Sequence, residues 1–106
     1  MPTYLWSASY TAEGTRGLLK DGGSKRRAAV QQMVETAGGK LHAFYYAFGE
    51  GDVYGIVELP DAIAATALSL AINASGAVQL RTTALITPEE VDAASKRSVA
   101  YRPPGA

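Results

Sequence analysis

Residues 38–61, GGKLHAFYYAFGEGDVYGIVELPD, decide the fold of this 106-residue chain. They predict strands over 41–48 and 53–59, because both segments are rich in the β-branched and aromatic residues that suit a pleated sheet. The four residues 49–52, GEGD, lie between the two strands, and together the three segments predict a β-hairpin. Pro60 and Asp61 follow directly and mark the beginning of a helix.

On the N-terminal side of the hairpin the sequence predicts one strand and one bent helix. Residues 4–10 alternate aromatic and small side chains, which is typical of a strand. Thr11 is a good N-cap for a short helical turn, and Gly22 and Gly23 then interrupt the helical pattern. Helical spacing resumes after Ser24, a second candidate cap, and Gly38 and Gly39 end it.

On the C-terminal side the sequence predicts a helix, a strand over 77–86 and a short third helix that ends near Arg97. The third helix begins at Thr87, since Pro88 and Glu90 complete a capping signal. The helix after Asp61 carries two apolar stripes, so it needs a second packing partner, either the first helix or another subunit. One stripe consists of Ile63, Ala67, Leu70 and Ala74, and the other of Leu68 and Ile72.

This order of elements predicts an α+β fold, a ferredoxin-like βαββαβ sandwich. Its four-stranded antiparallel sheet has helices on one face and is followed by a short C-terminal helix and a tail. We expect one domain over 1–97 and a tail over 98–106, whose strand-like start, 99–102, lies either on its own sheet edge or on a neighbouring subunit. The opposite sheet face then meets water, another subunit or a ligand.

Composition excludes several classes of function. Ten basic and ten acidic residues leave no formal net charge, so we expect no nucleic-acid partner. Residues 62–80 lack charges but are interrupted by polar residues and a glycine, so we expect no membrane partner. The chain has no cysteine and a single histidine, His42, and we expect no metal and no cofactor. The absence of cysteine and of a secretion signal at the start predicts a cytoplasmic location.

Several motifs follow one another along the chain: Met1-Pro2-Thr3-Tyr4, Gly38-Gly39-Lys40-Leu41, Phe44-Tyr45, Phe48-Gly49-x-x-Asp52 and Ile56-Val57-Glu58-x-Pro60-Asp61. In this order they resemble the GYD domain family over about residues 1–95. The family pattern places a tyrosine before the motif aspartate, and this chain has Gly51 there. The resemblance implies a ferredoxin-like domain related to the dimeric α+β barrels, in which two sheets pair through their open faces. It implies no settled activity.

Strand register predicts which side chains share each face of the hairpin. With a four-residue loop, Phe48 pairs with Val53, and Phe44, Tyr46 and Phe48 join Val53, Val57 and Leu59 on the helix-covered face. The opposite face then carries Leu41, Ala43, Tyr45 and Ala47 beside Tyr54, Ile56 and Glu58. Either Arg81 and Thr83 or Leu80 and Thr82 complete it from the last strand.

The candidate site residues are Tyr45, Tyr54, Glu58 and Arg81, together with the family-motif positions Gly49, Asp52, Pro60 and Asp61. Glu58 lies in mid-strand, and we expect Arg81 as its partner across the sheet, either in an interface salt bridge or in an acid–base pair. Tyr45, Tyr54, Tyr4 and Trp6 are candidates for the wall of a small-molecule pocket or for packing. His42 is expected to be an ordinary edge residue.

Two functions remain open at this point. The first is a homo-oligomeric module, a dimer or larger, that pairs through its open face and encloses a small apolar or aromatic ligand. The second is a cofactor-free enzyme of the α+β barrel type, similar to a monooxygenase or isomerase, that acts on a small cyclic substrate.

Overall fold

The computed structural model of the protein describes residues 1–47 and 49–106. The described residues form four strands and four helices in the predicted order. The strands are β1 (Thr3–Tyr10), β2 (Lys40–Tyr46), β3 (Val53–Glu58) and β4 (Val78–Leu85), and the helices are α1 (Ala12–Asp21), α2 (Gly23–Thr36), α3 (Ala62–Ala74) and α4 (Pro88–Ser95).

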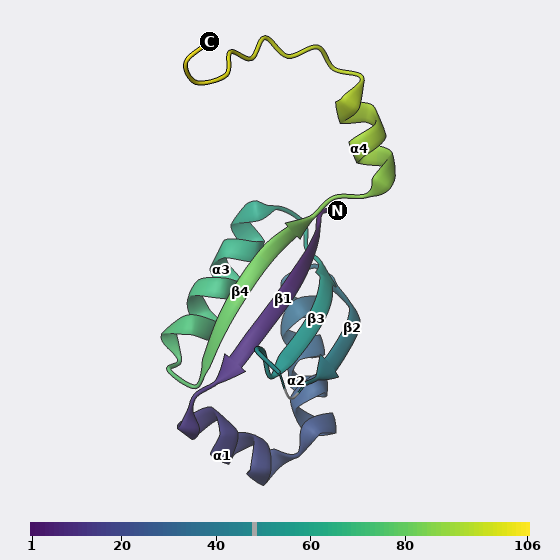
Figure 1. Ribbon diagram of the computed structural model, residues 1–106. Helices are drawn as coiled ribbons and strands as arrows, with labels where there is room; N and C mark the ends of the chain where they lie inside the picture. The colour runs from purple at the N-terminus through teal and green to yellow at the C-terminus, as the bar shows by residue number, and fades with distance from the viewer. Residues whose placement is uncertain (48) are drawn as a thin grey trace.

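The strands form one antiparallel sheet in the order β2-β3-β1-β4, as in the predicted ferredoxin-like fold (Figure 1). Helix α2 packs on β2 and helix α3 on β4, both behind the sheet in Figure 1. The face turned toward the viewer carries no helix of the described chain. The predicted two-layer α+β sandwich is therefore confirmed.

The hairpin register differs from the prediction, but Phe44 and Tyr46 lie on the predicted face of the sheet. Tyr46, not Phe48, pairs with Val53, so the connection is two residues longer than expected. A shift of two residues preserves the faces of a strand, because side chains alternate with a period of two. Phe44 and Tyr46 accordingly lie on the helix-covered face, opposite Gly55 and Val53. Phe48 lies outside the described residues.

A β-bulge at His42 makes one predicted position wrong. Leu41 pairs with Val57 and Ala43 pairs with Ile56, so His42 is the extra residue between them. One inserted residue reverses the faces on one side of a bulge. Leu41 therefore packs against the buried core instead of lining the open face, whereas Ala43 and Tyr45 remain on the open face as predicted.

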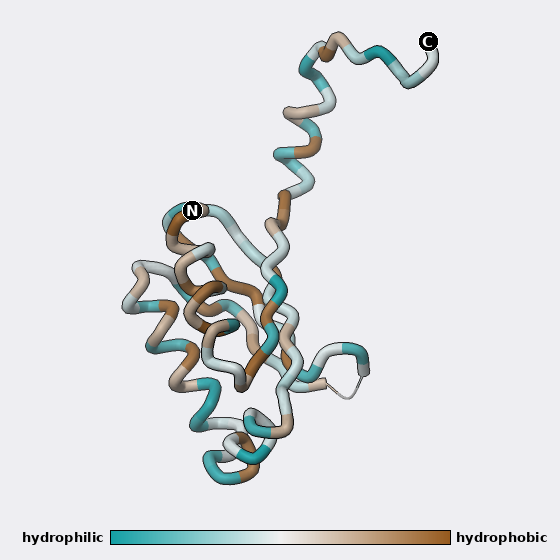
Figure 2. Tube along the Cα trace, turned by 90° about the vertical axis from the view of Figure 1, so that its left-hand side faces the viewer, coloured by the Kyte–Doolittle hydropathy of each residue, from teal (hydrophilic) through white to brown (hydrophobic). Residues whose placement is uncertain are grey.

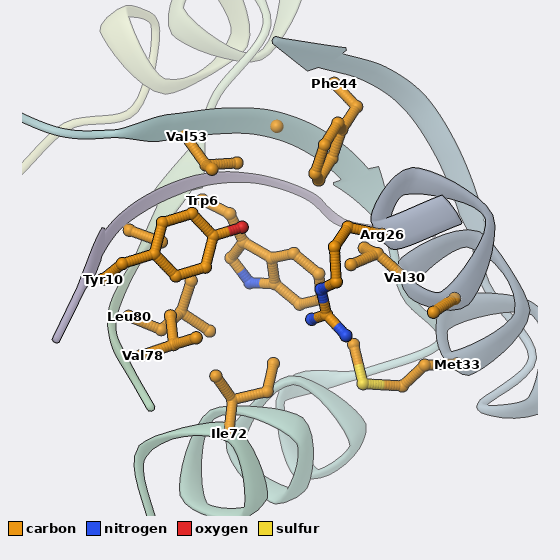
Figure 3. Close-up of a pocket in the computed structure, with 13 residues that line it drawn as sticks. Trp6, Tyr10, Arg26, Val30, Met33, Phe44, Val53, Ile72, Val78 and Leu80 are labelled. Atoms are coloured by element: carbon orange, nitrogen blue, oxygen red, sulfur yellow. The ribbon is translucent and has the colours of Figure 1, made fainter. Parts of the chain in front are cut away.

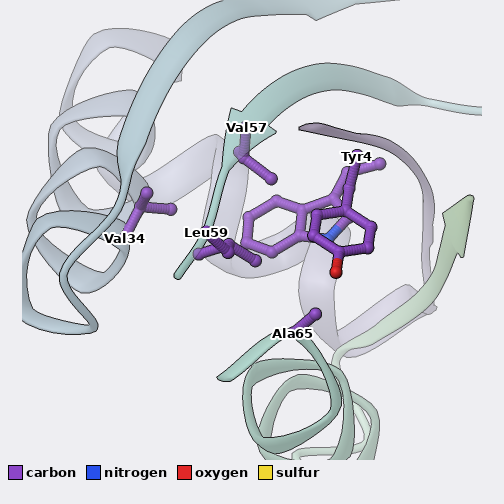
Figure 4. Packing of buried hydrophobic residues seen from close by; sticks show 6 residues of the cluster. Tyr4, Val34, Val57, Leu59 and Ala65 are labelled. Atoms are coloured by element: carbon purple, nitrogen blue, oxygen red, sulfur yellow. The ribbon is translucent and has the colours of Figure 1, made fainter. Parts of the chain in front are cut away.

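The core lies between the sheet and the helices (Figure 4). Three side chains are fully buried: Val34 of α2, Val57 of β3, and Leu59, which directly follows β3. Tyr4 and Trp6 of β1 and Ala65 of α3 complete the cluster. Removing several methyl groups from a fully buried side chain such as Leu59 costs about 2–5 kcal/mol, so this cluster carries much of the stability.

The helix caps follow the sequence closely at most ends. The Thr11 and Asp61 side chains accept hydrogen bonds from the N–H groups of Gly14 and Ala64. The predicted bend at the glycines is a complete break, since α1 ends at Asp21 and Gly22, with φ of 82°, serves as the N-cap of α2 in place of Ser24. A positive φ is accessible to glycine at little cost.

Helix α3 turns one of its two apolar stripes toward the sheet. Leu68 and Ile72 pack against the core beside Ala65, while Ile63 is 80% exposed and Leu70 is 67% exposed.

The described helices are short: none of them in residues 1–47 or 49–106 is long and apolar enough to cross a membrane.

Helix α4 and the tail project from the sheet domain as an arm (Figures 1 and 2). The radius of gyration is 17.0 Å, whereas a compact chain of this length has about 13 Å. Ile86, Val91, Val99 and Tyr101 are exposed along the arm. The expectation that the tail lies on its own sheet edge is therefore wrong, and contact with a neighbouring subunit stays a prediction.

Candidate functional site

The open sheet face presents two of the predicted aromatic residues, Tyr45 and Tyr54, in one row. Tyr45 of β2 lies opposite Tyr54 of β3, Tyr54 lies opposite Ser7 of β1, and Ser7 lies opposite Arg81 of β4. Ile56, Leu5 and Thr83 form the adjacent row in the middle of the sheet. Arg81 and Thr83, and not Leu80 and Thr82, are therefore the residues that β4 adds to this face.

Glu58 does not pair with Arg81. Glu58 shares its row with Thr3, whereas Arg81 shares its row with Ser7, four positions along β1, which is about 13 Å. The Oε1 atom of Glu58 instead lies 2.9 Å from Nε2 of His42, which the bulge turns toward it. Both side chains are about one-third exposed, so the His42–Glu58 pair contributes little to stability.

Arg81 and Tyr54 line a polar hollow of about 450 Å³ at the hairpin end of the open face. The other residues that line the hollow are Ser7, Ser9, Glu50, Gly51, Gln79 and Leu80. Glu58 and Tyr45 do not line it. Tyr45, Tyr54 and Arg81 thus share one row of the open face, whereas Glu58 lies apart from them beside His42.

The family-motif positions act mainly in holding the fold. The Asp52 carboxylate accepts a hydrogen bond of 2.9 Å from the Tyr10 N–H group, and the Asp52 N–H group donates to the Ala8 carbonyl at 2.8 Å. Asp61 caps α3, Pro60 lies beside Gly38, and Gly49 is exposed. Asp52 therefore anchors the hairpin connection to β1.

An apolar cavity of about 150 Å³ lies on the other side of the sheet, between it and helices α2 and α3 (Figure 3). Trp6 and Phe44 supply aromatic walls, Val30 and Met33 line it from α2, and Ile72 lines it from α3. Further lining residues are Ala8, Tyr10, Arg26, Ala29, Val53, Gly55, Val78 and Leu80. The size is that of a cavity that admits a benzene ring.

Small residues in the middle of the sheet create this space. Gly55 lies between Phe44 and Trp6 in one row of the helix-covered face, and Ala8 lies between Val53 and Leu80 in the next row. The helices do not close the gap, because α2 packs on β2 at one edge and α3 on β4 at the other. An opening is left over the central strands.

The polar groups of the cavity lie at its mouth and beneath it. The Tyr10 hydroxyl and the Arg26 guanidinium turn toward the middle of the ring of lining side chains (Figure 3). The indole N–H group of Trp6 is buried and has no hydrogen-bond partner among the described residues. An unpaired buried donor costs about 1–3 kcal/mol, which an acceptor that reached it would recover.

Tyr46, the last residue of β2, lies close to Tyr10. Its hydroxyl group donates a hydrogen bond of 3.0 Å to the Gly23 carbonyl and so joins β2 to the first turn of α2. Burial, and next the neighbouring Tyr10 phenol, raise the pKa of Tyr46 above its usual value. The neutral phenol is therefore the form that the fold favours.

Sequence reasoning found one wall of this cavity and missed the rest. Trp6 was a predicted pocket residue and lines the cavity, whereas Tyr45 and Tyr54 lie on the opposite face and Tyr4 belongs to the core. The available signal was Gly55, because a glycine in the middle of a strand rich in large residues leaves a space or a close approach.

Comparison with curated proteins and with solved structures gives no match. A family model, that of the GYD domain, matches residues 4–95. The match extends from β1 through α4 and includes both faces of the sheet described above. The family resemblance of the hairpin motifs therefore extends over most of the chain, which belongs to the GYD domain family.

Proposed function

We propose that the protein binds a small, mainly apolar ring compound in the cavity between its sheet and helices. The observation that carries this proposal is the cavity of about 150 Å³ with Trp6 and Phe44 as walls. Ligand sites are typically concave and apolar with a few polar groups at defined positions, and this cavity has Tyr10 and Arg26.

Binding fits this cavity better than proton-transfer chemistry. Among the described lining residues, the ionisable side chains are those of Tyr10 and Arg26. The described lining has no carboxylate and no imidazole, the side chains that most often serve as general acid or base. The cofactor-free enzyme remains the alternative, and its support is an analogy of fold alone.

The single tryptophan offers a direct test, since Trp6 lines the cavity and gives one indole N–H resonance. Titration with benzamide, a neutral ring compound of suitable size, is expected to shift this resonance saturably. The variant Ala29→Phe fills the mouth from α2 and should abolish the shift. Ala28→Phe, one residue earlier on the same helix and outside the cavity lining, is the matched control. An unchanged indole resonance, or equal binding by Ala29→Phe, would rule out this site.

We infer in addition that a second copy of the chain covers the open sheet face. This is supported by the apolar row of Leu5 and Ile56 in the middle of an uncovered sheet, flanked by Tyr45 and Tyr54. Aromatic residues at the centre of a surface and few charges are typical of interface cores. The charged groups of this face lie at its borders: Lys40 and Glu58 are at one end, and Arg81 is on the edge strand β4.

Sedimentation velocity at micromolar concentration is expected to give a dimer or a larger oligomer. The variant Ile56→Lys places an ammonium group in the middle of the open face and should produce a monomer. Ile63→Lys is the matched control, because Ile63 is exposed on α3, on the other side of the molecule. A wild-type protein that sediments as a monomer would end this second proposal without affecting the first.

A further inference from the structure

The mouth of the apolar cavity carries a positive charge that makes no ion pair with the described residues. Arg26 lines the cavity from α2, and no carboxylate of the described residues lies within 4.0 Å of its guanidinium. The neighbouring acidic residue Asp21 is 4.0 Å from Lys25. Among the described residues, Arg26 therefore has no ion-pair partner within 4.0 Å, and it lines an apolar cavity.

The ionisable neighbours of Arg26 in the two hollows that it lines are one tyrosine and two carboxylates. Tyr10 lines the cavity beside it, and both residues also line an adjoining groove of about 430 Å³ beneath α1. Glu13 and Asp21 are the acidic residues of that groove, and Glu13 is exposed to solvent. The cavity itself has no acidic side chain among its described lining residues. Arg26 thus borders an apolar cavity without carboxylates on one side and a groove with two carboxylates on the other.

We propose, building on the ligand-binding function above, that the ligand is a small ring-bearing carboxylate. The ring occupies the cavity against Trp6 and Phe44, and the carboxylate lies at the mouth on the Arg26 guanidinium, next to the Tyr10 hydroxyl. A guanidinium matches a carboxylate with two parallel N–H···O hydrogen bonds, which neutral ring compounds cannot form. The combination selects for an anionic head group on an apolar body of about one ring.

The experiment compares two ligands that have nearly the same shape and differ in charge. Benzoate and benzamide are titrated into the full-length protein at pH 7 and 150 mM salt, with the Trp6 indole resonance as the readout. Wild-type protein is expected to bind benzoate at least about tenfold more tightly, since hydrogen bonds to charged groups exceed neutral ones by that order. Arg26→Gln should reduce this preference to about one while leaving the affinity for benzamide within about twofold.

Arg27→Gln is the matched control, because it removes the same charge from the next position of α2, which does not line the cavity. It should leave the preference for benzoate intact, and an equal loss in both variants would mean a general effect of charge and would overturn the proposal. Equal affinity of the wild-type protein for both ligands would also overturn it while the cavity stands as a binding site. Failure of both ligands to bind would instead overturn the proposed function itself.

Discussion

Gly51 lies against the ring of Tyr54, so closely that a Cβ atom on the glycine would be 2.9 Å from the Tyr54 hydroxyl oxygen and 3.0 Å from the ring carbon that bears it. Gly51 is buried, and the same Cβ atom would be 3.2 Å from the Ser7 hydroxyl oxygen. The phenol of residue 54 therefore occupies the space into which a side chain at residue 51 would extend. This is the position at which the family pattern has its tyrosine.

The contact predicts that Gly51→Ala is destabilising in the presence of Tyr54 only. The nearest atoms that the new Cβ would meet are the outer end of the half-buried Tyr54 side chain, which can yield, so we expect a loss of about 1 kcal/mol, the low end of overpacking costs, in the free energy of unfolding measured in urea. In a Tyr54→Ala background the same substitution should cost much less, which a double-mutant cycle measures directly. Gly49→Ala is the control, because a Cβ atom at Gly49 meets nothing within 4 Å. A penalty for Gly51→Ala that persists without Tyr54 would contradict this explanation.

Helix α1 provides a second pair of glycines with opposite expected effects. A Cβ atom on Gly14 would collide with the carbonyl oxygen of Ala77, to which Thr11 also donates a backbone hydrogen bond of 3.0 Å. A Cβ atom on Gly17 meets nothing. Gly14→Ala should therefore lower the free energy of unfolding by about 1–3 kcal/mol. Gly17→Ala should raise it by about 0.5–1 kcal/mol, because alanine has the better helix propensity.

Thermal and urea unfolding of the two variants check this prediction side by side. Since both substitutions are on one helix and of one type, helix propensity alone would move them in the same direction. Stabilisation by Gly14→Ala would mean that α1 does not press against the beginning of β4 in solution.

Much of the fold could be predicted from the sequence because local signals agreed with one another. The Asp61 and Thr87 caps and the period-two pattern of the hairpin each specify an element without tertiary information. The sheet face of Phe44 and Tyr46 was predicted correctly even though the hairpin loop is two residues longer than expected, because a register shift of two residues leaves each side chain on the same face.

The remaining features depend on contacts that no local pattern encodes. The bulge at His42 is a single inserted residue, and it moved Leu41 to the core and gave Glu58 a partner other than Arg81. The cavity depends on the separation between α2 and α3, which tertiary packing sets. The choice between the two stripes of α3 has the same origin, because both have helical spacing and only one meets the sheet.

Tyr46 predicts a specific change of stability at alkaline pH. Burial raises its pKa above 10.0, so the folded state favours the neutral phenol more than the unfolded state does. This stabilisation is fully present below the unfolded-state pKa and is lost as the pH rises through the folded-state pKa. Tyr46→Phe should cost about 1 kcal/mol at neutral pH through the lost hydrogen bond to Gly23. It should also make the decline of stability above pH 10 less steep.

Urea unfolding between neutral and alkaline pH measures both effects of Tyr46→Phe. Tyr45→Phe is the control, since Tyr45 is the adjacent residue, lies on the open face and is 71% exposed. The two variants should differ in the slope of stability against pH, and identical alkaline slopes would refute the assignment to Tyr46.

Helix α4 should respond to acid independently of the rest of the protein. The Thr87 N–H group donates to the Glu90 carboxylate at 3.0 Å, and the Glu90 N–H group donates to the Thr87 hydroxyl oxygen at 3.1 Å. The backbone hydrogen bond from Thr87 lowers the pKa of Glu90. The stabilisation of the cap is therefore present above the unfolded-state pKa of Glu90 and is lost as the pH falls through the lower, folded-state value.

The helical content of residues 88–95, measured from Cα chemical shifts of the full chain, should decrease on acidification and in Thr87→Ala at neutral pH. An eight-residue helix is marginal without its cap, so the loss should be large. Because α4 projects from the sheet, the urea midpoint of the sheet domain should stay unchanged in this variant. Glu89→Gln is the control, since Glu90 supplies the carboxylate of the capping box. A parallel fall in the stability of the sheet would show that the arm packs on a surface, and the natural place to look for it is a second copy of the chain.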